Sequence, residues 1–237
     1  MLVIRQPAGQ GPRISISILV AEFGGTAVLV AAVVGSGIMA TALTPDLGLA
    51  LLINAVATTA ALGVLIWACA PLSGAHFNPA VTLVAVLTRQ MRVKVAVLYV
   101  VVQIAGALAG VALAQAMFDR SWWEPASQLR VGWDLWLGEV VATGGLIVVI
   151  GLLVRRGQGS LAAVLVPLWI GSAYFVTSST SFANPAVTIG RSLSDSFAGI
   201  APASVPAFIA AQLLGAILGA ALLFSTDPSR RRSRPQS

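Results

Sequence analysis

The sequence predicts an all-α membrane protein in which six spanning helices and two re-entrant half-helices form an inverted repeat. Three observations carry this prediction. Hydrophobic residues make up 57% of the chain and charged residues only 9%, which is far more apolar than a soluble domain. Long segments are nearly free of charge, and the two halves of the chain carry matching motifs in the same order. We therefore treat residues 1–237 as a single membrane domain.

Each charge-poor segment is close to the roughly 20 residues that a spanning helix needs. We expect the spans at about 14–37, 47–70, 93–117, 132–154, 159–178 and 203–224. The first segment follows Arg5 and Arg13 and could be read as a secretory signal peptide. Its apolar stretch is too long, contains Glu22 and precedes further spans, so we expect an uncleaved first helix.

The formal net charge of +6 raises the possibility of a nucleic-acid partner. With both termini placed in the cytoplasm, most basic residues fall on the cytoplasmic side: Arg5, Arg13, Arg89, Arg92, Lys94, Arg155, Arg156, Arg230, Arg231, Arg232 and Arg234. Arg120, Arg130 and Arg191 fall outside. This positive-inside bias predicts the orientation and removes the need for a nucleic acid. We expect the basic tail, about 226–237, to be a disordered topology anchor, with binding to anionic lipid headgroups as the alternative.

Three motifs recur in order in the two halves, about 14–117 and 132–224. The pairs are Glu22-Phe-Gly-Gly-Thr26 with Glu139-Val-Val-Ala-Thr143, Asn78-Pro-Ala-Val-Thr82 with Asn184-Pro-Ala-Val-Thr188, and the segments 103–110 with 212–219. Because each half has an odd number of spans, the second half must be inverted. Inverted repeats place the functional site near the midplane, where the halves meet. The glycine pairs Gly106/Gly110 and Gly215/Gly219 have the spacing that lets membrane helices pack closely.

Each Asn-Pro-Ala triplet, Asn78-Pro79-Ala80 and Asn184-Pro185-Ala186, is followed by a short apolar segment. About ten helical residues rise about 15 Å, half of the hydrocarbon core. Asparagine is a strong N-cap and proline suits the first helical position, so each triplet predicts the start of a half-helix. The amide NH2 remains free to face a lumen, and the positive helix ends that meet there oppose cations. The alternative is that both triplets are ordinary caps in a re-entrant transporter.

The residues that lead into the triplets, 73–77 and 178–183, must be non-helical at membrane depth. Such backbone is tolerated only where it is buried or lines a wet cavity. We expect a wall of main-chain carbonyls facing a wall of apolar side chains, which suits small neutral solutes.

The segment Ser73-Gly74-Ala75-His76-Phe77-Asn78-Pro79-Ala80-Val81-Thr82, with the second triplet, resembles the signature of the major intrinsic protein family, the aquaporins and aquaglyceroporins. The resemblance extends over nearly the whole chain. It implies an aquaporin-like right-handed helix bundle, a homotetramer with one pore per subunit, and a multi-pass protein of the bacterial inner membrane. It also implies a structural, buried role for Glu22 and Glu139, with Gln103 and Gln212. It places Gly74, Ala75 and His76 beside the pore, where His76 either braces the loop or acts as a pH gate.

The resemblance also locates a selectivity filter. Most family members carry arginine directly after the second triplet, whereas this chain has Val187. Counting back by the family's spacing, the expected filter is Thr58, Ser172, Ser181 and Val187. All four are small and uncharged, which implies a wide constriction. Arg191 lies one helical turn after Val187, so it is expected either in the outer vestibule or extended to the membrane interface.

The Val-containing second motif resembles that of a bacterial subgroup associated with arsenic resistance. This resemblance implies passage of arsenite or methylated arsenicals in addition to water and small polyols. The alternative function is an ion-coupled secondary transporter that uses Glu22 or Glu139, since intramembrane carboxylates often carry protons. An enzyme is not expected, because His76 has no evident nucleophile or acid partner. Cys69 is the single cysteine, no metal-ligand set is evident, and no cofactor is expected.

Overall fold

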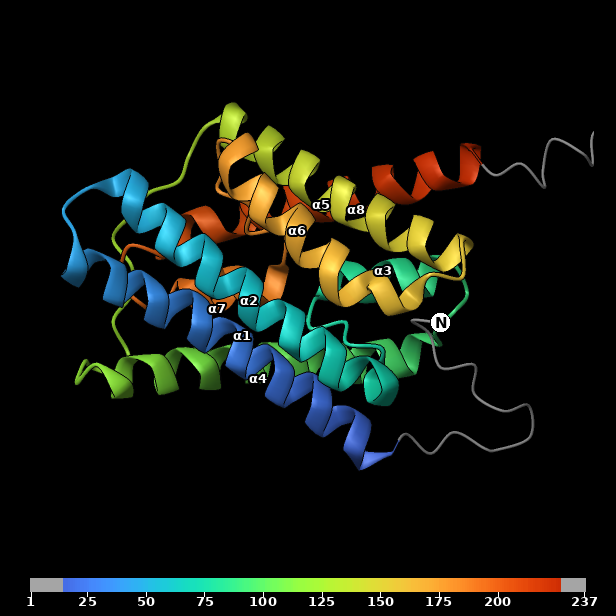
Figure 1. The fold of residues 1–237 in the computed structure, drawn as a ribbon, viewed down its shortest axis with the longest axis horizontal. Helices are drawn as coiled ribbons and strands as arrows, with labels where there is room; N and C mark the ends of the chain where they lie inside the picture. The colour runs from blue at the N-terminus through green and yellow to red at the C-terminus, as the bar shows by residue number, and fades with distance from the viewer. Residues whose placement is uncertain (1–14, 227–237) are drawn as a thin grey trace, which may run out of the picture.

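The computed structural model is a helical bundle and describes residues 15–226. Arg5, Arg13 and the basic tail with Arg230, Arg231, Arg232 and Arg234 lie outside the described residues. The elements are α1 (Ile16–Leu43), α2 (Leu47–Ser73), α3 (Pro79–Leu87), α4 (Val93–Met117), α5 (Trp133–Arg155), η1 (Gly159–Leu161), α6 (Ala162–Val176), α7 (Pro185–Arg191), η2 (Pro202–Ser204) and α8 (Val205–Ser225) (Figure 1). Within this part of the chain there is no β-strand, so the all-α prediction is confirmed.

Six of these helical segments are long and apolar enough to cross a membrane: α1, α2, α4, α5, η1 with α6, and η2 with α8. Their ends agree with the predicted spans to within a few residues, except that α1 continues to Leu43. The two half-helices, α3 and α7, have nine and seven residues. They therefore extend through only part of the bundle (Figure 1).

In both halves, glycine residues allow two helices to pack closely. A Cβ atom added to Gly106 of α4 would lie 2.3 Å from the carbonyl oxygen of Phe23 in α1. In the second half, a Cβ atom on Gly215 of α8 would lie 2.4 Å from the carbonyl oxygen of Val140 in α5. Only glycine permits such an approach of two helix backbones. The glycine pairs thus set the packing of α1 on α4 and of α5 on α8.

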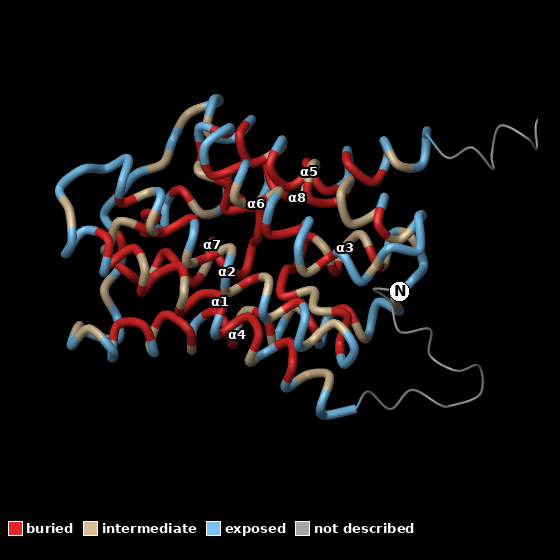
Figure 2. The backbone as a smooth tube through the Cα atoms, viewed as in Figure 1, coloured by how far each residue is buried: buried red, intermediate tan, exposed pale blue. Residues whose placement is uncertain are grey.

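Burial separates the inside of the bundle from a hydrophobic outer surface. The buried residues follow the inward faces of the helices, and the exposed residues lie on the outside and at the two ends (Figure 2). Large apolar side chains such as Trp67, Val176 and Leu218 are exposed on that outer surface. An apolar exterior of this kind is the surface that a lipid bilayer covers.

The start of α1 and the end of α8 lie at the same end of the bundle (Figure 1). The loops that join α1 to α2 and α4 to α5 lie at the opposite end. This arrangement is the one that an inverted repeat of three spans each requires, and it brings the half-helices α3 and α7 toward each other from the two ends.

Candidate functional site

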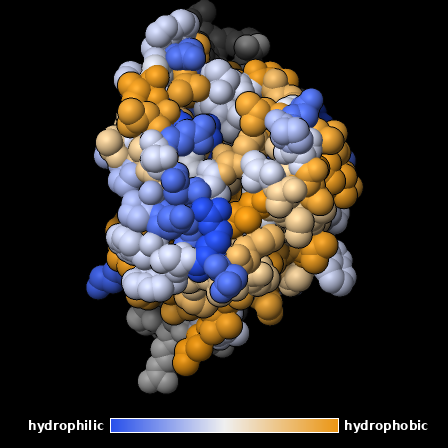
Figure 3. Space-filling view, turned by 90° about the vertical axis from the view of Figure 1, so that its left-hand side faces the viewer, coloured by the Kyte–Doolittle hydropathy of each residue, from blue (hydrophilic) through white to orange (hydrophobic). Residues whose placement is uncertain are grey.

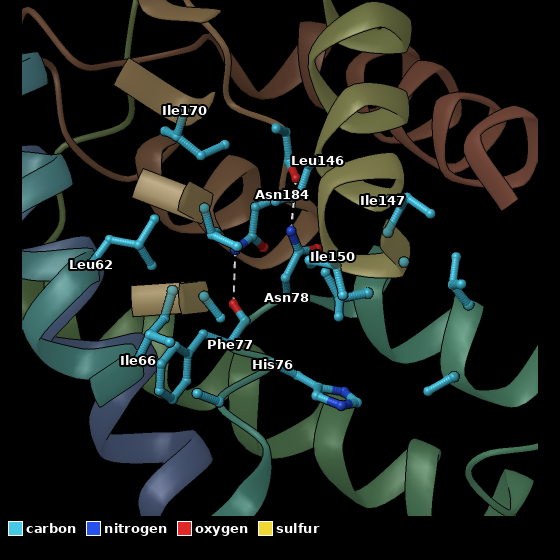
Figure 4. A pocket seen from close by; sticks show the side chains of 18 of the residues that line it. Leu62, Ile66, His76, Phe77, Asn78, Leu146, Ile147, Ile150, Ile170 and Asn184 are labelled. Carbon is cyan, nitrogen blue, oxygen red and sulfur yellow. Dashed lines mark hydrogen bonds between the residues drawn. The ribbon is translucent and has the colours of Figure 1, made fainter. Parts of the chain in front are cut away.

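The two triplet asparagines brace each other's loops at the centre of the bundle. Asn78 Nδ2 donates to the carbonyl oxygen of Ala183 over 2.7 Å, and Asn184 Nδ2 donates to that of Phe77 over 2.7 Å (Figure 4). The side-chain oxygens cap α3 and α7, since Asn78 Oδ1 accepts from Ala80 N and Asn184 Oδ1 accepts from Ala186 N. Each amide therefore uses one N–H for the brace and keeps a second donor.

The backbone before each asparagine is held in the left-handed region. Phe77 and Ala183 both have φ 49, and neither is glycine. Such a conformation costs on the order of 1–3 kcal/mol per residue and persists only where its surroundings enforce it. The two residues share this φ, and the carbonyl group of each accepts a hydrogen bond from the asparagine of the other half. Gly74, Ala75, Thr180 and Ser181 also have positive φ in these loops.

Glu22 of α1 enforces the conformation of the first loop. Its carboxylate accepts hydrogen bonds from the main-chain N–H groups of His76 and Phe77, at 2.9 and 2.8 Å, and from Ser73 Oγ at 2.6 Å. Gln103 Nε2 of α4 donates to the same carboxylate at 2.8 Å. The side chain of Glu22 is fully buried and does not line the cavity described below.

Glu139 of α5 repeats this role in the second half. It accepts from the main-chain N–H groups of Phe182 and Ala183, both at 2.9 Å, and from Gln212 Nε2 of α8 at 2.6 Å. It is also fully buried and absent from the cavity wall. Because both carboxylates accept main-chain donors away from the cavity, their geometry favours loop support over proton-coupled transport.

A cavity of about 380 Å³ passes through the site. Its lining runs from Thr88 and Arg155 at one end, past Asn78 and Asn184, to Arg191 at the other. The wall opposite the loops is apolar and includes Leu62, Ile66, Leu146, Ile150 and Ile170 (Figure 4). The loop residues before each triplet and these apolar side chains thus line the same cavity.

At the α7 end of this cavity, Thr58, Ser181 and Val187 are all buried and line the wall. Ser172 does not, because it lies on the exposed surface of α6. The cavity-facing residues of α6 instead follow four-residue spacing: Ala162, Val166, Ile170 and Tyr174. Ser172 lies two residues from this series, about 200° away around the helix. The placement of Ser172 in the filter was therefore wrong, and Tyr174 occupies that wall.

Tyr174 adds an aromatic ring to this part of the cavity wall. Its hydroxyl donates to Thr58 Oγ1 over 3.3 Å, which links α6 to α2. The hydroxyl of Ser181 is buried and has no hydrogen-bond partner among the described residues. In place of the expected set of four small residues, this part of the wall contains Tyr174 together with Thr58, Ser181 and Val187.

Arg191, the last residue of α7, is only 2% exposed. Its Nε donates to the carbonyl oxygen of Ala198, and its guanidinium carbon lies 3.3 Å from the centroid of the Phe182 ring. It lines the main cavity and also a second cavity of about 200 Å³ next to it. Arg191 is therefore buried at the mouth of the cavity and does not extend to the membrane interface.

The remaining predicted residues lie around the first loop and the helix starts. Gly74, Ala75 and His76 line the cavity. His76 Nδ1 is 3.0 Å from Thr82 Oγ1, and its ring packs edge-on against Tyr99 with centroids 5.3 Å apart. Pro79, Ala80, Pro185 and Ala186 are buried at the starts of the half-helices. These contacts fit a histidine that braces the loop.

Sequence reasoning missed two residues of the site, Tyr174 and Phe182. The four-residue spacing that ends at Tyr174 is present in the sequence and could have identified it. Phe182 lies in a loop without periodicity, so no comparable signal points to it. Among residues 15–226 no three His, Cys, Asp or Glu side chains gather in a way that could hold a metal ion. What the arrangement offers is a row of hydrogen-bond donors and acceptors along an apolar wall.

Comparison with known proteins gives a consistent result. Residues 14–183 and 176–236 match the family model described as Major intrinsic protein. The chain is 48% identical to Aquaglyceroporin AqpS of Rhizobium meliloti (strain 1021) over 222 residues, 92% of this chain and 95% of that protein. It is 32% identical to the Probable aquaporin PIP2-8 of Oryza sativa subsp. japonica, over 55% of this chain and 52% of that one. The aquaglyceroporin from Plasmodium falciparum, solved by X-ray crystallography, has the same fold, with a TM-score of 0.65 at 18% identity over 92% of this chain and 99% of that one.

Proposed function

Because the chain belongs to the major intrinsic protein family, we propose that it is a passive membrane channel for water and small neutral solutes, including glycerol-like polyols. The observation that carries this proposal is the pair of Asn78 and Asn184 amides, fixed by opposed carbonyls inside one continuous cavity. Fixed donors beside an apolar wall replace part of a solute's hydration without binding it strongly. The positive ends of α3 and α7 meet at the same place and oppose cations.

We assign selectivity to Thr58, Tyr174, Ser181 and Val187, with Arg191 one turn beyond them. The wall at Val187 is apolar, and Ser181 adds a hydroxyl that has no hydrogen-bond partner among residues 15–226. The combination of a hydroxyl group, an aromatic ring and an aliphatic side chain favours polyols over ions. The positive charge of Arg191 lies at the mouth instead of directly after the triplet.

Metalloid hydroxides are the further substrates that we propose. Arsenous acid, the form of arsenite at neutral pH, is compact and uncharged and presents several hydroxyl groups, as glycerol does. A constriction that passes glycerol meets the same shape and hydrogen-bonding pattern in arsenous acid. Methylated arsenicals replace hydroxyl groups with methyl groups, which suit the apolar side of Val187. The 48% identical relative is itself called an aquaglyceroporin.

We further propose that both termini are cytoplasmic, that the protein resides in the inner membrane of a bacterium, and that it assembles as a homotetramer. The orientation rests on Arg89, Arg92 and Lys94, which follow α3 at the end of the bundle where α1 starts. Positive residues of short loops favour the cytoplasmic side. The homotetramer rests on the family resemblance.

Stopped-flow light scattering with proteoliposomes tests the channel. We expect rapid shrinkage in an impermeant osmolyte, re-swelling in glycerol, and uptake of arsenite that does not respond to a protonophore. Vesicles that pass water but neither glycerol nor arsenite would contradict the proposed substrates. Uptake that collapses with the proton gradient would instead support a transporter. Vesicles with Asn78→Asp and Asn184→Asp should lose solute flow, because each carboxylate replaces an amide donor with a negative acceptor.

A further inference from the structure

Two arginines share one aromatic ring at the α7 end of the molecule. The guanidinium carbon of Arg191 lies 3.3 Å from the centroid of Phe182, and that of Arg130 lies 5.1 Å from it. Phe182 is itself held edge-on against Phe208, with centroids 5.1 Å apart. Cation–π contacts of this kind fix the positions of both guanidinium groups. The ring therefore holds two positive charges close together at the mouth of the cavity.

Within the described part of the chain, neither of these arginines has a carboxylate partner within 4 Å. The ion pair found among residues 15–226 joins Arg120 to Glu124, at 2.8 Å, and involves neither Arg130 nor Arg191. The carboxylate of Glu139 is occupied by the loop N–H groups and Gln212. That of Asp195 accepts from Ser127, at 2.9 Å for both its main-chain N–H and its hydroxyl. Buried or partly buried charges are normally paired, so this positive site is unbalanced.

Arg130 and Arg191 both line the second cavity, of about 200 Å³. Gln128, Thr180 and Asn54 add polar groups to its wall, and Leu47, Leu51 and Phe197 complete it. Hydrophilic residues gather in a patch on this end of the molecule, and hydrophobic residues lie mainly to the right of it (Figure 3). The second cavity thus combines two guanidinium groups with neutral polar side chains and a partly apolar wall.

Several donors in this cavity are unused. Arg191 uses Nε for Ala198, and Arg130 uses Nε for Gly199 at 3.0 Å and Nη2 for Gln128 Oε1 at 3.1 Å. No hydrogen bond within residues 15–226 engages the two Nη atoms of Arg191 or Nη1 of Arg130. A guanidinium presents such N–H groups as a planar fork that matches two oxygens on one centre.

We propose that this mouth binds a small oxyanion, such as inorganic phosphate or sulfate, between the forks of Arg130 and Arg191. Occupancy also obstructs solute passage, because Arg191 lines the main cavity as well as the second one. The obstruction rests on the proposed channel function, whereas the binding does not.

Binding is tested with the purified full-length protein in detergent. Inorganic phosphate should raise the thermal unfolding temperature more than chloride does at the same ionic strength. The dissociation constant for phosphate should rise at least about tenfold in Arg130→Gln and in Arg191→Gln, because each substitution removes charge-assisted hydrogen bonds. Arg130→Lys should weaken phosphate binding less than Arg130→Gln does, since lysine keeps the positive charge although it lacks the planar fork of N–H groups. Size-exclusion chromatography confirms that each variant is folded.

Arg120→Gln is the matched control, because it removes one positive charge from the same end without touching either cavity. It should leave phosphate binding unchanged. The proposal would be overturned if Arg120→Gln weakened phosphate binding as much as the other two substitutions do. It would also be overturned if chloride raised the unfolding temperature of the wild-type protein as much as phosphate does. Either result would mean that phosphate responds only to diffuse surface charge. A response to phosphatidylglycerol micelles but not to inorganic phosphate would assign the arginines to a lipid headgroup and also overturn it.

Flux is measured separately in proteoliposomes. Glycerol re-swelling should slow at least about twofold in phosphate relative to chloride, with half-inhibition near the dissociation constant, and Arg130→Gln should lessen this inhibition. Binding without inhibition would overturn the obstruction but keep the binding site. Absence of flux in every buffer would refute the channel itself, while the binding measurement would still decide the oxyanion site.

Discussion

The hydroxyl of Tyr174 donates a hydrogen bond to Thr58 Oγ1 over 3.3 Å, linking α6 to α2 in the wall of the cavity. Tyr174 is buried, and its ring forms part of the wall beside Val187. The α6 side chain that occupies the cavity wall near Val187 is therefore that of Tyr174 and not that of Ser172. The Tyr174 ring thus adds aromatic bulk to a wall that also contains the smaller side chains of Thr58, Ser181 and Val187.

The first prediction concerns this ring. Tyr174→Ala should widen the constriction and raise glycerol flux relative to water flux by about threefold or more, an order-of-magnitude estimate from the volume removed. Tyr174→Phe keeps the ring and should change the ratio by less than about twofold, because only one weak hydrogen bond is lost. Stopped-flow measurements of both fluxes provide the ratio. Ser172→Ala, on the exposed face of the same helix, serves as the control, and a larger change there than in Tyr174→Ala would restore Ser172 to the filter.

Val187 provides the second prediction. Val187→Arg introduces a cation one turn before Arg191 and should lower glycerol and arsenite flux at least about tenfold relative to water, since a long charged side chain then crosses the narrow end. Val187→Leu adds bulk without charge and should reduce solute flux less. The double change of Val187→Arg with Arg191→Val keeps the net charge and separates narrowing from repulsion between the arginines. A solute profile that none of these variants alters would contradict the assignment of Val187.

The fold was predictable because its signals are local. Length and hydropathy identify each span, and the repeated motifs indicate which contacts recur in both halves. The position of Ser172 was not predictable by counting from the triplet, because the count does not take account of which face of α6 turns toward the cavity. The helical spacing from Ala162 to Tyr174 is a property of α6 itself and is the better guide. The contacts of Arg191 with Phe182 and Ala198 depend on how two aperiodic loops fold over each other, which no local pattern specifies.

The third prediction tests the buried carboxylates. In Glu139→Gln an amide NH2 replaces an oxygen that faces the main-chain donors of Phe182 and Ala183 or the amide of Gln212. Leaving buried donors unpaired should lower the free energy of unfolding by about 1–3 kcal/mol. Thermal unfolding in detergent measures the loss. Glu124→Gln, on the surface at the α7 end, should cost less than about 1 kcal/mol. A folded Glu139→Gln protein with unchanged stability but no transport would support a direct role for this carboxylate in proton coupling.

The loop contact of Asp195 predicts a pH dependence. Hydrogen bonds from the main-chain N–H and hydroxyl of Ser127 lower the pKa of this exposed carboxyl below its ordinary value. Because the folded-state pKa lies below the unfolded value of about 3.9, the contact stabilises the protein above that pH and is lost as the pH falls through the folded-state pKa. Asp195→Asn should therefore lower the unfolding temperature slightly at pH 7, and the difference from wild type should shrink in acid. A difference that grows on acidification would contradict the contact.

The last prediction compares two glycines of the first half. A Cβ atom on Gly106 would lie 2.3 Å from the carbonyl oxygen of Phe23, whereas one on Gly24 would meet nothing within 4 Å. Gly106→Ala should force α4 away from α1 and lower the free energy of unfolding by about 1–3 kcal/mol. Gly24→Ala should be neutral or stabilise α1 by up to about 1 kcal/mol, because alanine is the better helix former. Unfolding temperatures in detergent distinguish the two. Equal effects would mean that helix propensity, and not the close approach of α1 and α4, explains the glycine at position 106.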